Sequence, residues 1–373
     1  MKKNKTAELF LVLLVLIVMS AGILILQNGM EKLQSVKQES VYAPETRDLY
    51  NNYGLKNDQS LSKTKILETQ DQVIYTDRIF NINQISEENV SYAADIMKAL
   101  QKKSGKATYI MPIPQRAVFE GGYETEKEKY SDFIEKLEAS FSDPSVVLNP
   151  LSELEKHQDE YIYFRTGNSW TMRGAFYGAQ AIFGELGYDK ENLDAYREYV
   201  FGNFKGNLLL EALGKYTTDE IKKGIENVEE EPFYIYINGS NPNREELTFE
   251  NKEGQLQTLK RQTIQFNSSG NYAVIGSGYK HSIVEGRGKG QRKGNLLLIA
   301  DTRGKMMISY LSEIFEKVYV SNMYEDADLI QNLDEILEKY DIECIIWAQD
   351  VAETGNKSYM NALNPLLKGG GNG

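Results

Sequence analysis

The sequence predicts an α/β fold built on a mostly parallel sheet, and three observations support this expectation. The chain has 373 residues, 41% of them hydrophobic and 11% aromatic, which is enough for one large or two small domains with a substantial core. Short apolar runs typical of strands alternate with amphipathic stretches of helical period in both halves of the chain. Strands separated by helices at this spacing indicate parallel pairing with right-handed crossovers.

In the first half, the helix expected over residues 86–103 has its apolar residues three and four positions apart, and Ser86 is suited to its N-terminus. Pro112 and Pro114 end the strand expected at residues 107–111, since proline donates no ladder hydrogen bond. The other expected elements of this half are strands at 73–75, 79–80 and 146–148 and a helix at 126–140.

The second half repeats the alternation and is preceded by a β-rich insertion. We expect strands at 296–300, 318–320 and 342–347 and helices at 306–315 and 329–340. Asn-Gly and Ser-Gly turn signals separate further β-rich runs at 232–237, 256–266 and 272–275. These runs predict an inserted antiparallel piece between the two halves.

Residues 9–26 form a nearly uninterrupted apolar stretch. A helix of this length spans about 27 Å, close to the thickness of a bilayer core. Lys2, Lys3 and Lys5 precede it, which by the positive-inside tendency leaves the N-terminus in the cytoplasm and the rest of the chain outside. We expect an uncleaved membrane anchor. A cleaved signal peptide is the alternative, although no good small-x-small cleavage site follows the apolar core.

The expected organisation is therefore a single-pass protein of the cell membrane with its C-terminal domain outside. Residues 1–8 are the cytoplasmic N-terminus, 9–26 the anchor, and 27–70 a polar stalk without sustained periodicity. Residues 71–350 form the α/β domain, and residues 351–373, which end in a glycine-rich run, form a flexible tail.

Composition argues against several functional classes. The net charge of -12 and the pI near 5.0 argue against a nucleic-acid partner, because binding to phosphate backbones needs an excess of Lys and Arg. Two His residues are few for a metal enzyme, and we expect neither a metal nor another cofactor. Cys344 is the only cysteine, so no disulfide can form within the chain.

Two motifs lie where a strand runs into a helix. In the first, the apolar and aromatic run 161–164 leads to the tetrapeptide Gly167-Asn168-Ser169-Trp170, and residues at helical spacing follow from Met172. In the second, the apolar run 295–300 leads into Asp301-Thr302 and then a helix. Functional sites of open α/β sheets lie at such strand ends.

These motifs resemble the signature of the DHHW family, a bacterial branch of the SGNH-hydrolase-like acyltransferases that includes periplasmic alginate O-acetylation proteins. In that family an Asp-x-His-Trp tetrapeptide precedes a Thr and a Gly-Ala helix, and a buried strand ends in Asp-Ser, with the Ser as nucleophile. Here Gly167 stands at the Asp position, Ser169 at the His position and Thr302 at the Ser position. The resemblance covers roughly residues 70–350 and implies an SGNH-like three-layer α/β/α domain.

The three replacements remove the catalytic triad that the resemblance implies. A nucleophilic hydroxyl needs a histidine to accept its proton and a carboxylate to orient that histidine. Neither Gly167 nor Ser169 acts as a base near pH 7, so we expect a catalytically degenerate site. The alternative is an active O-acetyltransferase or esterase with a site rebuilt from Thr302, Ser169 or His281; otherwise His281 and His157 are expected at the surface.

The same strand ends offer residues for binding without catalysis. Asp301 is expected to make a structural hydrogen bond at a helix start, and Trp170 is either a core residue or a face for sugar stacking. Residues 276–294 form a glycine-rich cationic loop, which is either a solvated hairpin or a positive rim suited to an anionic polymer. The binding candidates are Arg165, Asn168, Trp170, Asp301, Arg303, Arg287, Lys289, Arg292 and Lys293.

The expected function is that of a non-catalytic binding or accessory protein in the O-acylation of a cell-envelope polysaccharide or wall polymer. The resemblance implies a membrane-bound O-acyltransferase as partner. The cationic loop indicates an anionic or sugar-containing envelope polymer as ligand. Besides the rebuilt enzyme, a structural assembly protein of the cell surface is a further alternative.

Overall fold

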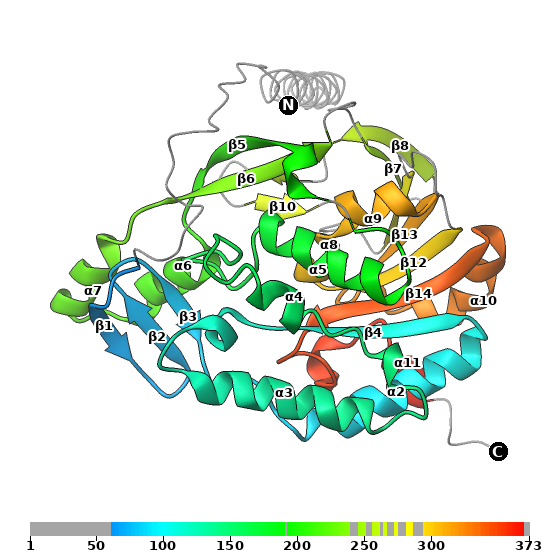
Figure 1. The fold of residues 1–373 in the computed structure, drawn as a ribbon, viewed down its shortest axis with the longest axis horizontal. Helices are drawn as coiled ribbons and strands as arrows, with labels where there is room; N and C mark the ends of the chain where they lie inside the picture. The colour runs from blue at the N-terminus through cyan, green and yellow to red at the C-terminus, as the bar shows by residue number, and fades with distance from the viewer. Residues whose placement is uncertain are drawn as a thin grey trace, which may run out of the picture. The chain divides into compact units, whose positions relative to one another are not determined.

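The computed structural model describes residues 61–190, 192–238, 245–250, 256–261, 264–266, 272–274, 281–285 and 294–368. Within these residues the central element is a 7-stranded sheet (Figure 1). Parallel strands form one side of it and antiparallel strands extend the other side. In spatial order the strands are β4 (Ala107–Ile113), β14 (Ile342–Asp350), β12 (Asn295–Ala300), β13 (Lys317–Asn322), β11 (His281–Glu285), β7 (Glu245–Glu250) and β8 (Leu256–Arg261).

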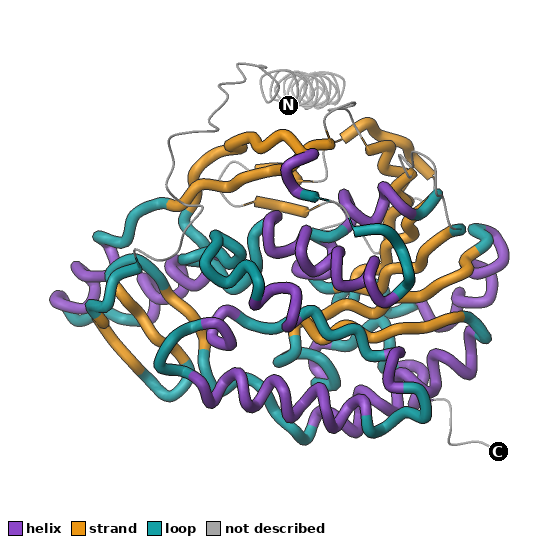
Figure 2. The backbone as a smooth tube through the Cα atoms, in the orientation of Figure 1, coloured by secondary structure: helices purple, strands orange, loops and turns teal. Residues whose placement is uncertain are grey.

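Helices cover both faces of the parallel strands, because these strands are apolar on both sides. Leu296 and Leu298 of β12 pack with one group of helices, while Leu297 and Ile299 pack with the other. Figure 2 shows the sheet between the two groups, which gives three layers. The first group is α5 (Met172–Glu185) and α9 (Ile308–Ile314), and the second is α2 (Asn89–Ser104), α3 (Glu124–Glu138), α10 (Leu329–Lys339) and α11 (Pro365–Lys368).

Smaller elements complete the domain. An antiparallel sheet of β1 (Lys65–Glu68), β2 (Gln72–Tyr75) and β3 (Ile79–Asn81) packs its apolar side on α6 (Asn207–Lys215) and α7 (Asp219–Glu226). Two antiparallel pairs are β5 (Tyr196–Phe204) with β6 (Glu231–Asn238) and β9 (Ile264–Phe266) with β10 (Tyr272–Val274). The short helices are α4 (Leu151–Glu155), α8 (Thr302–Lys305) and the 3-10 turns η3 (Arg116–Phe119), η4 (Pro144–Val146), η5 (Leu193–Ala195) and η6 (Lys357–Tyr359).

The alternation of strands and helices and the antiparallel insertion are confirmed, with two differences from expectation. Residues 146–148 do not form a strand, because η4 occupies Pro144–Val146 and only Val147 bridges to Ile110. Residues 161–164, expected to form a strand that leads into a helix, do not form one either, because Tyr163 makes only an isolated bridge to Trp170. In the antiparallel insertion, β7, β8 and β11 extend the central sheet beyond β13, while β5 with β6 and β9 with β10 form separate pairs.

The α/β domain is larger at both ends than the sequence indicated. Residues 61–70, expected to end the stalk, include β1, whose backbone pairs with β2. Residues 351–368, expected to form a tail, are packed against the second helix group: Val351, Met360 and Leu363 are fully buried there. Both segments therefore belong to the folded domain: Ile66 and Leu67 pack, partly buried, against the apolar cluster under α6 and α7, and the apolar side chains of residues 351–368 lie in the core.

Several expectations concern residues outside the described ranges. These are the cytoplasmic N-terminus 1–8, the anchor 9–26 and the first part of the stalk, 27–60. No helix in the part of the chain that the structure describes is long and apolar enough to span a bilayer.

Candidate functional site

The carboxyl ends of β12 and β14 place Asp301 and Asp350 side by side. The two strands are parallel neighbours with Ala300 paired to Ala348, so the residues that follow emerge at one edge of the sheet. The Asp350 amide donates to Asp301 Oδ2 at 3.1 Å, and the Gly304 amide donates to Asp301 Oδ1 at 2.8 Å. Fully buried Asp301 is therefore the N-cap of α8, which confirms the structural role expected for it.

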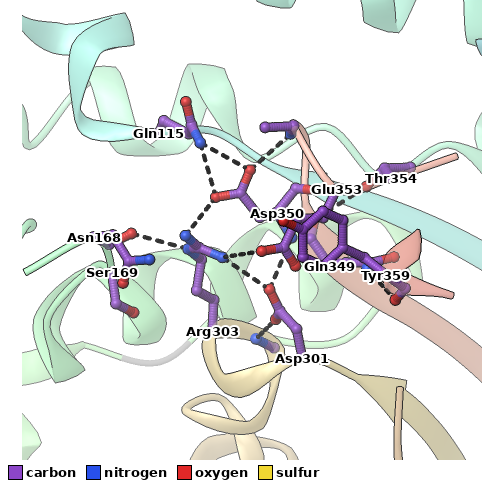
Figure 3. Close-up of polar contacts among 12 residues, drawn as sticks. Gln115, Asn168, Ser169, Asp301, Arg303, Gln349, Asp350, Glu353, Thr354 and Tyr359 are labelled. Carbon is purple, nitrogen blue, oxygen red and sulfur yellow. Dashed lines mark hydrogen bonds and ion pairs between the residues drawn. The ribbon is translucent and has the colours of Figure 1, made fainter. Parts of the chain in front are cut away.

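The Arg303 side chain joins these strand ends to the Gly167–Trp170 tetrapeptide (Figure 3). Its Nη1 lies 3.1 Å from Asp301 Oδ2, its Nη2 lies 2.7 Å from Asp350 Oδ2, and its Nε donates to the Asn168 carbonyl at 3.0 Å. Gln115 Nε2 donates to both oxygens of Asp350, at 3.1 and 3.2 Å. Arg303 is only 6% exposed, so a buried guanidinium fills the space between the two motifs.

Asp301, Asp350 and Glu353 surround this single guanidinium. Glu353 lies 3.9 Å from Arg303 Nη1 and accepts a hydrogen bond from the Tyr324 hydroxyl. Burial raises the pKa of Glu353 to about 7; Arg303 opposes this shift, while Asp301 and Asp350 add to it. Burial also raises the pKa of Asp350, although Arg303 opposes that shift too. Burial therefore brings the pKa of Glu353 close to neutral pH.

Buried Glu231, at the start of β6, fixes the loop that leads into the tetrapeptide. Its carboxylate accepts hydrogen bonds from the amides of Arg165 and Thr166, at 2.6 and 2.7 Å, and from the hydroxyls of Thr166 and Tyr161. Burial raises the pKa of Glu231, although these hydrogen bonds oppose the shift. Gly206 approaches so closely that a β-carbon there would lie 2.3 Å from the Thr166 carbonyl carbon. The loop backbone is thus held by contacts with residues distant in sequence.

Trp170 and Ser169 point into the core. The Trp170 indole donates from Nε1 to the Arg303 carbonyl at 3.0 Å, and a β-carbon on Gly178 of α5 would lie 2.6 Å from Trp170 Cη2. Trp170 is 0% exposed, so it is a core residue and its ring offers no face to a sugar. The buried Ser169 hydroxyl lies 3.3 Å from Sδ of Met306.

Thr302, half-buried at the start of α8, has no imidazole base. Its hydroxyl makes no hydrogen bond within the described part of the chain. His281 begins β11, two strands from β12, which is roughly 10 Å away at the usual strand spacing. His157 binds Glu160 instead. With Ser169 turned toward the core, the rebuilt site of Thr302, Ser169 and His281 is not assembled.

Lys305 is a buried amine that sequence analysis missed. It lies one helical turn after Thr302, and its side chain makes no ion pair or hydrogen bond to a described residue although it is only 1% exposed. Burial lowers the pKa of Lys305 to about 8. No sequence pattern signals this property, because the pKa of a lysine depends on its burial.

The remaining binding candidates are placed as follows. Asn168 exposes its side chain and binds Arg303 through its carbonyl, while Arg165 is half-buried. Residues 281–285 of the expected cationic loop form the strand β11, so the loop prediction was wrong there, while Arg287, Lys289, Arg292 and Lys293 lie outside the described residues. Asp350 was also missed, although it is the last residue of the largely apolar strand β14 and the strand-end rule would have indicated it. Among the described residues no group of three or more His, Cys, Asp or Glu is arranged to hold a metal ion.

A family model for the DHHW protein matches residues 44–321. The chain belongs to the DHHW family. A DHHW protein of Eubacterium siraeum is similar in structure, with a TM-score of 0.60 at 18% identity over 81% of this chain and 98% of its own. Bacillus cereus PatB1, solved with a sulfonyl adduct, has a TM-score of 0.54 at 12% identity over 78% of this chain and 99% of its own. The O-acetyltransferase domain of Pseudomonas putida AlgJ has a TM-score of 0.45 at 11% identity over 82% of this chain and 96% of its own.

None of the curated proteins matches the sequence. The DHHW resemblance of the two motifs is nevertheless confirmed at the level of family and fold. Both motifs meet at the end of the sheet, where Arg303 bonds the Asn168 carbonyl and Asp301. The DHHW fold is therefore present, while Gly167 and Ser169 supply neither the acid nor the imidazole of the family motif.

Proposed function

We propose that this DHHW protein is a non-catalytic binding or accessory component of envelope-polysaccharide or wall-polymer O-acetylation. Membership in the DHHW family supports the O-acetylation setting. In the proposed arrangement residues 9–26 anchor the chain in the cell membrane, and the α/β domain lies outside, beside a membrane-bound O-acyltransferase. The ligand is an anionic or sugar-containing envelope polymer, for which the loop cations Arg287, Lys289, Arg292 and Lys293 are suited.

The observation that carries the proposal is the position of the Arg303 guanidinium. An SGNH-type acyl transfer needs an imidazole beside the nucleophile to accept its proton. Arg303 lies between the two motifs instead, and it cannot take that role because a guanidinium has no acceptor and stays protonated. Burial lowers its pKa, but Asp350 and Asp301 outweigh burial and raise it above the ordinary value.

Lys305 favours a second candidate function, an esterase or acetyltransferase in which Thr302 is the nucleophile. Some acyl enzymes pair a serine with a lysine one helical turn later, in a Ser-x-x-Lys arrangement. The run Thr302-Arg303-Gly304-Lys305 has the same spacing, and burial lowers the pKa of Lys305 to about 8. A neutral lysine amine can accept a proton, so this candidate calls for a test of its own.

Release of p-nitrophenol from p-nitrophenyl acetate separates the two functions. We expect the parent protein to match the Thr302→Ala variant at pH 7 and at pH 9, with no burst of product. Thr302→Ser alone should not create activity, because no base is added. A burst that disappears in both Thr302→Ala and Lys305→Met, and that rises with an apparent pKa near 8, would instead establish the second function.

Binding is tested apart from chemistry. Co-sedimentation with teichoic-acid-bearing walls should fall when Arg287, Lys289, Arg292 and Lys293 are all replaced by Ala, and the remaining binding should depend less on salt. Equal co-sedimentation of parent and variant at low and high salt would remove the loop from the proposed binding site.

A further inference from the structure

A second polar site lies away from the Arg303 cluster. A cavity of about 400 Å³ is lined by α5, by the turn after α4 and by β5 and β6. Binding pockets for small ligands commonly occupy about 300–1,000 Å³, so the space is sufficient for a small ring. Among the described residues, neither Thr302 nor Arg303 lines the cavity.

His157 and Tyr177 form an aromatic platform in this cavity. Their rings stack with centroids 3.6 Å apart and planes only 5° apart. Glu160 fixes both rings, because its Oε1 lies 2.8 Å from His157 Nδ1 and its Oε2 accepts from the Tyr177 hydroxyl at 2.8 Å. The His157 side chain remains 28% exposed, and its face opposite Tyr177 is not covered by that ring. An exposed ring face of this kind can pack against the C–H bonds of a sugar.

Arg173 holds the polar groups beside the platform in fixed positions. It pairs with Glu160 through Nη1 and with Glu198 Oε2 through Nη2, the latter at 3.1 Å. Its Nε donates to the Tyr236 hydroxyl at 3.0 Å, which in turn donates to Glu198 Oε2 at 2.7 Å. Burial raises the pKa of Glu160, but the hydrogen bonds from His157 and Arg173 outweigh burial and the net shift is downward. Glu198 Oε1 accepts no hydrogen bond from a described residue and is therefore available to a ligand hydroxyl.

The charges lining the cavity select among saccharides. Among the described residues that line the cavity, the carboxylates of Glu153, Glu160, Asp194 and Glu198 outnumber the cations Arg173 and Lys190. Lys156, which lies outside the lining, also pairs with Glu153. This excess of negative charge disfavours phosphate or uronate groups and accepts hydroxyls or an ammonium group. We propose that the cavity binds an uncharged or amino-sugar unit of a glycan. The inference goes beyond the proposed function and holds whether or not Thr302 reacts, because the two sites share no residue.

The small number of histidines gives a direct readout. The chain has only two, His157 in the cavity and His281 on β11, so imidazole proton NMR of the full-length protein reports each one separately. The probes are an N-acetylglucosamine tetramer, a glucosamine tetramer and a tetrauronate. We expect a saturable shift of the His157 signal with one or both of the first two and no shift of the His281 signal. The response to each tetramer also shows whether the unit is acetylated or free.

The aromatic platform and the Glu198 acceptor are tested with variants. Calorimetry measures the affinity of each variant for the tetramer that binds the parent protein. His157→Ala should weaken binding at least tenfold, which corresponds to about 1.4 kcal/mol, whereas His281→Ala, the matched control, should leave it unchanged. Glu198→Gln should weaken binding of the glucosamine tetramer more than that of the acetylated one, because it removes a negative charge. Thermal unfolding of each variant checks that it is folded.

The opposite results overturn the proposal. No saturable His157 shift with any probe at millimolar concentration would mean that the cavity is not a sugar site. A shift with the tetrauronate alone would contradict the charge argument. Unchanged affinity of a folded His157→Ala variant would show that the sugar does not bind on the aromatic platform. None of these outcomes affects the esterase assay at Thr302.

Discussion

Arg303 is a single buried cation that binds the ends of two strands and the loop beside them. Its partners Asp301 and Asp350 are both 0% exposed, and Asp301 also caps α8. Charges removed from water are costly unless they are paired and hydrogen-bonded, so each member of this cluster depends on the others. Arg303, which lies between the two motifs, is thus also a residue on which the stability of this region is expected to depend.

Replacing Arg303 should therefore destabilise the protein strongly. Arg303→Met leaves two buried carboxylates without their cation, and we expect the free energy of unfolding to fall by about 3–5 kcal/mol in urea titrations. Lys127→Met is the control, because Lys127 and Glu155 form an exposed pair whose loss should cost less than about 1 kcal/mol. Similar losses of unfolding free energy in both variants would show that the Arg303 cluster contributes no more to stability than the Lys127–Glu155 pair.

Glu353 should make stability depend on pH. Burial raises its pKa from the ordinary value of 4.5 to about 7 on folding, so between these values the native state holds a proton that the unfolded state has released. This contribution to stability is fully present below pH 4.5 and is lost as the pH rises through about 7.

Glu353→Gln keeps an acceptor for Tyr324 but cannot ionise. In urea unfolding at pH 4.5 and pH 8, this variant should gain stability relative to the parent as the pH rises. If the stability difference between variant and parent is the same at both pH values, folding does not raise the pKa of Glu353.

At the scale of elements, α5 connects the two sites. Its N-cap Thr171 directly follows Trp170, and its first turn carries Arg173, which organises the sugar cavity. The helix approaches the preceding segment so closely that a β-carbon on Gly174 would lie 2.2 Å from the Ile162 carbonyl oxygen. Packing therefore requires glycine at 174, and likewise at 178, where a β-carbon would lie 2.6 Å from Trp170 Cη2.

Gly174→Ala should destabilise the protein by about 1–3 kcal/mol through overpacking against the Ile162 backbone. Gly214 on α6 provides the control, since nothing lies within 4 Å of a β-carbon there. Gly214→Ala should raise stability by up to about 1 kcal/mol through helix propensity. Thermal unfolding measures both changes. If Gly174→Ala also proved stabilising, the close packing of α5 on the Ile162 backbone would be excluded.

At the scale of the whole molecule, the proposed arrangement separates an anchor from a large α/β domain. That domain begins by residue 61 and includes the packed segment up to residue 368, so both binding proposals concern one folded body. An envelope polymer reaches such a domain only if the domain lies outside the membrane.

This orientation is tested with intact protoplasts. Added protease should digest the α/β domain, and before digestion the protein should remain in the membrane fraction, because residues 9–26 are expected to span the bilayer. A soluble secreted form that begins near residues 22–30 would instead identify the apolar stretch as a cleaved signal peptide.

Local pattern was sufficient for a large part of the fold. The spacing of apolar residues predicted the alternation of strands and helices, and turn residues predicted the antiparallel insertion. The tetrapeptide at residue 167 and the Asp301-Thr302 strand end led to the DHHW family. These features can be recognised in sequence because each depends on residues that are neighbours along the chain.

The tertiary structure decided what the strand ends can do. It buried Trp170, brought Asp350 and Glu353 to Arg303, and left Lys305 buried without a partner among the described residues. It also assembled the sugar cavity from α5, β5 and β6. Burial and charge pairing depend on contacts between segments far apart in the chain, and these contacts set both the pKa of each group and its access to a ligand. The periodicity of the sequence does not indicate these long-range contacts.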